Sequence, residues 1–138
     1  MMIGYYLMFN NNCQEALDVY EKALGAKVLH KQTYGDMPPN PDFPVAEEDK
    51  GLVLNAQFEI AGTVIMVSDV GQLSADKGNN MYLTVTTDDK ELVTKAWEML
   101  KDGGEVINDL QPTFFAELHG SLRDKFGIGW MFTANLKS

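Results

Sequence analysis

The stretch Tyr6-Leu7-Met8-Phe9 leads through three asparagines into a helix-like run of residues that ends at Leu24. The same order returns in the second half of the chain. There Tyr82-Leu83-Thr84-Val85 stands 76 positions later (82 minus 6) and leads into a helix-like run that ends near Leu100. A repeat of this kind predicts two copies of one supersecondary unit.

The starts of the two helix-like runs keep the same spacing. Asn12 precedes Glu15 by three positions, and Asp88 precedes Glu91 by three positions, which is the spacing of a capping box. We therefore expect Asn12 and Asp88 to cap the two helices. Gly25 is expected to end the first helix, because glycine readily adopts the left-handed conformation found after helix ends.

Alternating apolar and polar residues predict the strands that surround these helices. In 52–60, for example, Leu54, Ala56 and Phe58 fall on one face, whereas Asn55 and Gln57 fall on the other. Each half then reads as β-α-β-β-β. The expected strands are 4–9, 26–34, 52–60 and 63–69 in the first half and 81–87, 105–110, 113–119 and 128–134 in the second, with the helices ending near 24 and 101.

The predicted fold is α+β, with two βαβββ modules whose helix-free sheet faces curl into a concave trough. We expect a single domain over residues 1–138, made of repeats at about 1–70 and 80–138 with a linker at about 70–80. Residues 35–51 contain four of the five prolines and a string of acids, so we expect a long loop there that could serve as a lid.

The charge and the cysteine content of the chain limit the kinds of partner and the cellular compartment that we expect. The net charge is −9 and the pI is about 4.5, which argues against nucleic acid and anionic membranes as partners. Cys13 is the single cysteine, so no internal disulfide is possible, and we expect a cytoplasmic protein. No apolar run approaches the roughly 20 residues that span a bilayer.

Several stretches resemble the vicinal-oxygen-chelate superfamily of glyoxalases, bleomycin-resistance proteins and extradiol dioxygenases, and within it the PhnB-like branch that is sometimes labelled demethylubiquinone-methyltransferase-like. These stretches are Tyr6-Leu7-Met8-Phe9, Asn12-Cys13, Glu15-Ala16, Tyr20, Ala23-Leu24-Gly25-Ala26, Ile60-Ala61-Gly62, Ile65-Met66, Ser68-Asp69, Thr113-Phe114-Phe115, Gly120, Asp124-Lys125-Phe126-Gly127 and Trp130. The branch usually has Phe-Trp-Gly where this chain has Phe114-Phe115-Ala116, a difference that could alter the wall of the groove.

The resemblance implies the glyoxalase/bleomycin-resistance fold, a homodimer, and metal ligands at inward-facing strand positions in those members that use a metal. Aligning strand with strand places these positions at Tyr5, Met66, Met81 and Met131. None of these residues is a carboxylate or an imidazole, which hard divalent cations need. We therefore expect no metal and no other cofactor.

Two pairs of polar residues are further candidates. Glu117 and His119 lie two apart on one expected strand, so they are either a general acid/base pair or an exposed polar edge. Asn55 and Gln57 share a strand face, and they would bind a ligand if that face lines the groove. Cys13 at a helix start reads as a buried structural cysteine rather than a reactive thiolate.

Three functions follow from these expectations. The first is a metal-free protein that binds a small, partly apolar molecule near Tyr5, Asn55, Gln57, Met66, Met81 and Met131. The second is a metal-dependent lyase, isomerase or dioxygenase with relocated ligands drawn from His30, Glu59, Glu117 and His119. The third is a dimeric interaction scaffold. The methyltransferase label gains no support, because no glycine-rich nucleotide loop follows the first strand.

Overall fold

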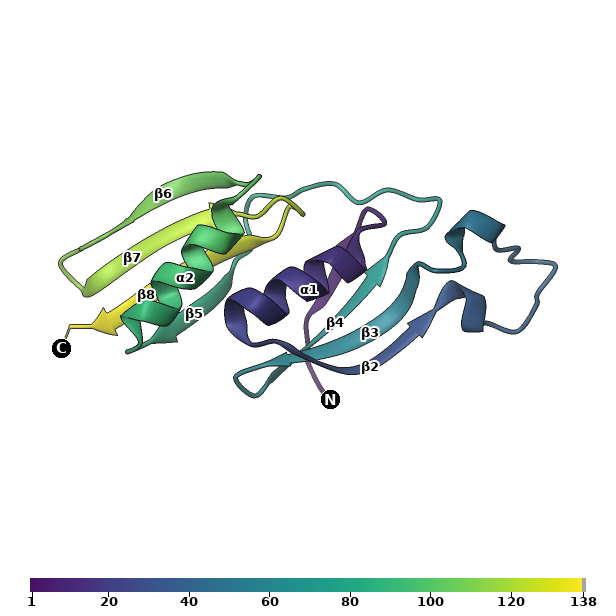
Figure 1. Cartoon of the computed structure of the whole chain (residues 1–138), viewed down its shortest axis with the longest axis horizontal. Helices are drawn as coiled ribbons and strands as arrows, with labels where there is room; N and C mark the ends of the chain where they lie inside the picture. The colour runs from purple at the N-terminus through teal and green to yellow at the C-terminus, as the bar shows by residue number, and fades with distance from the viewer. Residues whose placement is uncertain (138) are drawn as a thin grey trace. The chain divides into compact units, whose positions relative to one another are not determined.

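The structure, a computed structural model, describes residues 1–137 and divides into two compact units, Met1–Ala75 and Asp76–Ser138. The first unit contains one helix, α1 (Cys13–Leu24), and one mixed sheet with the strand order β1-β4-β3-β2 (Figure 1). Its strands are β1 (Tyr6–Phe9), β2 (Lys27–Thr33), β3 (Val53–Ile60) and β4 (Thr63–Asp69). β1 runs parallel to β4, and the other neighbouring strands are antiparallel.

The second unit repeats this topology with the strand order β5-β8-β7-β6. Its elements are β5 (Leu83–Thr87), α2 (Lys90–Lys101), β6 (Glu105–Gln111), β7 (Ala116–Arg123) and β8 (Gly129–Leu136). β5 runs parallel to β8, as β1 runs parallel to β4. The predicted α+β class with two βαβββ modules is therefore confirmed. No helix within residues 1–137 has the length and apolar character needed to cross a bilayer.

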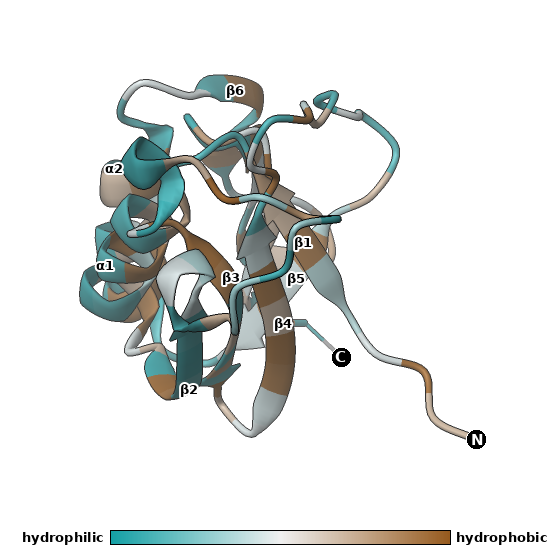
Figure 2. Cartoon of the chain, turned by 90° about the vertical axis from the view of Figure 1, so that its right-hand side faces the viewer, coloured by the Kyte–Doolittle hydropathy of each residue, from teal (hydrophilic) through white to brown (hydrophobic). Residues whose placement is uncertain are grey.

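Each helix covers one face of its own sheet. Tyr20 of α1 is fully buried, and its ring lies 5.9 Å from that of Phe58 on β3 and 6.5 Å from that of Phe9 on β1. In the second unit Trp97 of α2 meets Phe132 of β8 edge to face at 6.1 Å. Figure 2 shows the result for the first unit, where the outward side of α1 is hydrophilic and much of β3 and β4 is hydrophobic.

A buried carboxylate, rather than the side chain of the expected asparagine, caps α1. Asn12 makes no side-chain capping bond, whereas Oδ1 of Asp69 accepts a hydrogen bond of 2.8 Å from the backbone N–H of Cys13. Oδ2 of Asp69 accepts a second bond, also 2.8 Å, from the N–H of Val53. Asn12 is the N-cap residue of α1, as predicted, but the expected side-chain bond is missing, and a long-range acceptor at the end of β4 satisfies the first N–H of the helix instead.

The cap of α2 lies one residue later than expected. Oδ1 of Asp89, and not a side-chain atom of Asp88, accepts a 3.0 Å bond from the N–H of Leu92. The helix itself spans the expected residues. Adjacent aspartates both suit the N-cap position, so local composition does not choose between them.

The strand expected at 113–119 is the largest error in the predicted boundaries. β7 runs from Ala116 to Arg123, because the hydroxyl of Thr113 accepts bonds from the N–H groups of Phe115 and Ala116 and holds a turn there. Gly120 is inside the strand rather than at its end. A Cβ at this position would lie 2.8 Å from the Cα of Leu110, so the glycine permits a close approach of β6.

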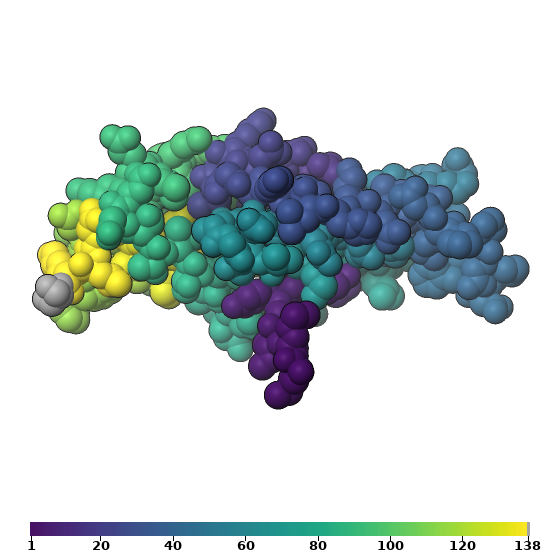
Figure 3. Space-filling view, turned by 90° about the horizontal axis from the view of Figure 1, so that it is seen from below, coloured from purple at the N-terminus to yellow at the C-terminus, as the bar shows by residue number. Residues whose placement is uncertain are grey.

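The proline-rich segment between β2 and β3 is a loop with two short 3₁₀ turns, Tyr34–Asp36 and Glu47–Asp49. It extends beyond the ends of β2 and β3 in Figure 1, and Figure 3 shows it as the blue lobe that protrudes from the first unit. The neck of the loop is closed by hydrogen bonds from the N–H of Tyr34 to the oxygen of Leu52 and from the N–H of Gly35 to the oxygen of Lys50.

Cys13 begins α1 and has no exposed surface. Burial, with a smaller effect from the charge of Asp69, raises the pKa of its thiol from 9.0 to about 12. The helix dipole therefore does not produce a thiolate here, and the interpretation of Cys13 as a buried structural cysteine is confirmed.

We predict that replacing Asp69 with alanine lowers the free energy of unfolding by about 2–4 kcal/mol, because two buried N–H groups lose their acceptor. Urea unfolding followed by circular dichroism measures the change. Asp88→Ala, at an exposed position beside α2, is the control and should change stability by less than about 0.5 kcal/mol. Equal effects of the two substitutions would contradict the role assigned to Asp69.

We predict that Cys13 does not react with a thiol-specific disulfide reagent at pH 8 in the native protein, and that it reacts fully in denaturant. A thiol whose pKa is raised in the folded state favours folding below its unfolded pKa. That contribution is lost as the pH rises from about 9 towards about 12. Absorbance of the released reagent gives the rate, and fast stoichiometric labelling without denaturant would refute the assignment.

Candidate ligand-binding faces

The helix-free face of the first sheet combines phenol, thioether and amide groups. Met66 of β4 lies opposite Tyr6 of β1 and opposite Gln57 of β3, and Gln57 lies opposite His30 of β2. Residues that face each other across neighbouring strands point to the same side of a sheet. These four side chains therefore line one face, and they lie opposite the side where Phe58 meets α1.

Of the other residues predicted for this region, Asn55 lies on the same face of the sheet, whereas Tyr5 is joined to it through its backbone. Asn55 lies opposite Gln32, and its amide donates a long bond of 3.5 Å to the side-chain oxygen of Gln32. Tyr5 precedes β1 and is 48% exposed, but its carbonyl accepts a 2.9 Å bond from the N–H of Met66. Tyr6, rather than Tyr5, is thus the direct neighbour of Met66 in the sheet.

The helix-free face of the second sheet carries hydroxyl groups around a methionine. Met131 of β8 lies opposite Thr84 of β5 and Ser121 of β7, and Ser121 lies opposite Asn108 of β6. The amide of Asn108 donates a 3.1 Å hydrogen bond to the hydroxyl of Ser121. Because Phe132, the next residue of β8, points at α2, the side chain of Met131 points away from the helix.

His119 belongs to this second face. Its Nδ1 lies 3.0 Å from the hydroxyl of Thr133, the residue opposite it on β8. Its ring also meets that of Phe115 edge to face at 4.9 Å. Thr133 and Phe115 therefore fix the plane of an imidazole that is only half-buried.

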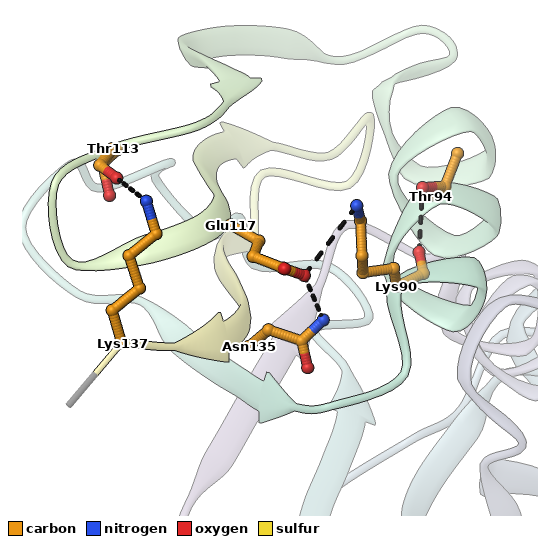
Figure 4. Close-up of polar contacts among 6 residues, drawn as sticks. All are labelled: Lys90, Thr94, Thr113, Glu117, Asn135 and Lys137. Atoms are coloured by element: carbon orange, nitrogen blue, oxygen red, sulfur yellow. Dashed lines mark hydrogen bonds and ion pairs between the residues drawn. The ribbon is translucent and has the colours of Figure 1, made fainter.

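Glu117 has partners different from those of His119. Figure 4 shows its carboxylate between an amide and an ammonium group. Oε2 accepts a hydrogen bond from the amide of Asn135 and lies 3.9 Å from Nζ of Lys90 at the start of α2. His119 instead bonds Thr133. The structure thus gives the two members of the hypothetical acid/base pair separate hydrogen-bond partners.

Met81 is the predicted site residue that lies farthest from a strand ladder. It is 78% exposed and precedes β5, which begins at Leu83 instead of residue 81. Thr84 faces Met131 in the second sheet as Tyr6 faces Met66 in the first. Tyr6 and Thr84 are 78 positions apart (84 minus 6), whereas the repeat in the sequence has an offset of 76. The sequence reasoning therefore missed Tyr6 and Thr84, although the apolar residues Leu7, Leu83 and Val85 beside them in the strands were a usable signal.

A hard metal ion does not fit the donors at these positions. Met66 and Met131 offer thioethers, and their neighbours Tyr6 and Thr84 offer a phenol and a hydroxyl, whereas Zn²⁺, Mn²⁺ and similar ions need imidazole or carboxylate ligands. The relocated set is not brought together either. Within residues 1–137, no three His, Cys, Asp or Glu side chains form a group that could hold a metal.

Known proteins are similar to this chain over almost its whole length. The model of the family described as 3-demethylubiquinone-9 3-methyltransferase matches residues 2–133. Protein YjdN of Escherichia coli (strain K12) is 31% identical over 139 residues, which cover 95% of this chain and 93% of YjdN. The crystal structure of protein PA1353 from Pseudomonas aeruginosa has a TM-score of 0.82 at 28% identity and covers 98% of both chains.

Two more distant structures show the same fold. The PhnB protein from Bacillus cereus has a TM-score of 0.80 at 23% identity, covering 97% of this chain and 99% of its own. The fosfomycin resistance protein FosX from Listeria monocytogenes has a TM-score of 0.64 at 12% identity, covering 98% and 92%. The chain belongs to the family described as 3-demethylubiquinone-9 3-methyltransferase, the PhnB-like family that its sequence resembles.

Proposed function

We propose that the protein binds a small, partly apolar organic molecule on the helix-free faces of its two sheets, and that it does so without a metal ion. The observation that carries this proposal is the chemistry of the two faces. At the centre of each stands a half-buried methionine, Met66 or Met131, beside a phenol or a hydroxyl. Thioether groups adapt well to apolar ligands and bind hard cations poorly.

Polar groups at the edges of both faces support a binding role. Ligand sites are mostly apolar and contain a few placed hydrogen-bonding groups. Asn55 and Gln57 supply amides in the first unit, and His119 and Asn108 supply an imidazole and an amide in the second. We also propose that Tyr5 lies at the rim of the first face and Met81 at the rim of the second, and that the chain forms a single domain.

One structure with the same fold is described with a metal ion. The FosX structure is described as a complex with Mn(II) and 1S,2S-dihydroxypropylphosphonic acid, whereas in this chain no carboxylate or imidazole lies directly opposite Met66 or Met131 on the neighbouring strands. We further propose a cytoplasmic homodimer. The family name includes a methyltransferase, and the ligand test below therefore includes S-adenosylmethionine.

We predict that the purified protein, loaded with excess Mn²⁺, Zn²⁺ or Fe²⁺ and then dialysed, retains less than about 0.1 equivalent of metal, because the two faces supply no hard donor set. Elemental analysis by mass spectrometry gives the ratio. One equivalent of bound metal that disappears in a Met131→Ala variant would show that the metal-free proposal is wrong.

We predict that native mass spectrometry of protein purified without additives, or a thermal-shift screen of small organic molecules, finds a ligand whose affinity falls at least about tenfold in Met66→Asp and Met131→Asp, since each change places a charge in an apolar contact. Leu73→Asp is the control, because Leu73 is 77% exposed and outside both sheets. Saturable one-to-one binding of S-adenosylmethionine, or equal losses in all three variants, would contradict the proposal.

A further inference from the structure

The loop between β2 and β3 contains a pocket of its own. Its volume is about 540 Å³, within the range of about 300–1,000 Å³ that is typical of small-molecule sites. It lies inside the first unit and is formed by consecutive turns of one segment. Its lining is mostly aromatic, proline and aliphatic: Tyr34, Gly35, Met37, Pro38, Pro39, Asn40, Pro41, Phe43, Pro44, Val45 and Lys50.

Local hydrogen bonds hold this pocket in shape. The hydroxyl of Tyr34 donates a 3.1 Å bond to the backbone oxygen of Asp69, which fixes the aromatic ring at the base of the loop. The N–H of Gly35 bonds the oxygen of Lys50 at the neck, and the side chain of Asn40 accepts a 3.0 Å bond from the N–H of Asp42 at the tip. The four prolines restrict the backbone between these points. The pocket is therefore preformed, and a ligand would not have to order the loop.

The charges around the pocket are nearly all negative. Along the sequence, five acids lie between the lining residues but are not themselves part of the lining: Asp36, Asp42, Glu47, Glu48 and Asp49. The charged side chain in the lining is Lys50. Nζ of Lys50 lies 2.7 Å from the carboxylate of Glu47, so its charge is already paired. An anionic ligand would meet uncompensated acids here, whereas a cation would be attracted.

We propose that this pocket binds an organic cation with a flat apolar body. The rings of Tyr34 and Phe43 provide faces on which a cationic ring system can stack, and the prolines and Met37 provide apolar contacts. The acids of the loop supply the complementary charge. The pocket is thus a second binding site, separate from the helix-free faces. In this proposal the loop binds a ligand itself and does not serve as a lid.

Thioflavin T, an aromatic cation, is a suitable probe, and its uncharged benzothiazole analogue without the N-methyl group is the matched control ligand. Titration followed by fluorescence anisotropy should show saturable one-to-one binding of the cation. The uncharged analogue should bind about fivefold to tenfold more weakly at low salt, and this difference should shrink at about 0.5 M salt. Equal affinity of the two compounds, or no saturation by the cation, would overturn the proposal.

Two phenylalanine variants test where on the protein thioflavin T binds. Phe43 is 54% exposed and Phe114 is 92% exposed in the second unit, so neither change should unfold the protein. Phe43→Ala should weaken thioflavin T binding about fivefold or more, Asp42→Asn with Glu48→Gln should remove the preference for the cation, and Phe114→Ala should change nothing. If Met66→Asp abolishes binding and Phe43→Ala does not, the probe sits on a helix-free face. This inference would then fail while the proposed function stands.

Discussion

The buried carboxylate of Asp69 is the constraint on which the first unit depends. Asp69 is the last residue of β4, and its carboxylate accepts hydrogen bonds from the first N–H of α1 and the first N–H of β3. Its backbone oxygen accepts a hydrogen bond from the hydroxyl of Tyr34. One residue thus joins β4, the helix, β3 and the loop: its carboxylate bonds α1 and β3, and its backbone oxygen bonds Tyr34 of the loop. Because α1 is fixed to one side of the sheet in this way, the side that contains Tyr6, Met66 and Gln57 stays uncovered by the helix.

The second unit reaches the same architecture with a different carboxylate. Asp124, in the turn between β7 and β8, accepts bonds from the N–H groups of Phe126 and Ile128 and from Nε1 of Trp130. This arrangement fixes the turn and orients Trp130, whose side chain is fully buried in the core. The two units therefore share topology and helix placement, whereas the buried acceptors that stabilise them lie at positions that do not correspond.

Much of the fold could be predicted from sequence because strand and helix periods are local properties. β4 and α2 have the predicted bounds, since their apolar spacing is regular and turn residues flank them. β7 was misplaced because the turn held by Thr113 and the close approach of Leu110 to Gly120 are not visible in the local residue pattern. Contacts of that kind are absent from any single stretch of sequence.

The candidate site was predictable in its chemistry but not in its register. The repeat in the sequence pairs Tyr6 with Tyr82, whereas the sheets pair Tyr6 with Thr84 as neighbours of Met66 and Met131. A shift of two residues keeps every side chain on its own face, so the character of the faces was preserved. Met81, which the shorter offset selected, lies before the strand, and Asp69 escaped notice because its partners are far away in sequence.

The most direct test of a thioether-lined, metal-free site is an NMR spectrum of the protein with ¹³C-labelled methionine methyl groups. The signals of Met66 and Met131 are assigned with Met→Leu variants and followed during addition of Mn²⁺ and then of an organic ligand. The account predicts that the ligand shifts both signals, and that Mn²⁺ broadens them no more than those of the exposed Met1 and Met2. Selective broadening of Met66 and Met131 by one equivalent of Mn²⁺ would contradict it.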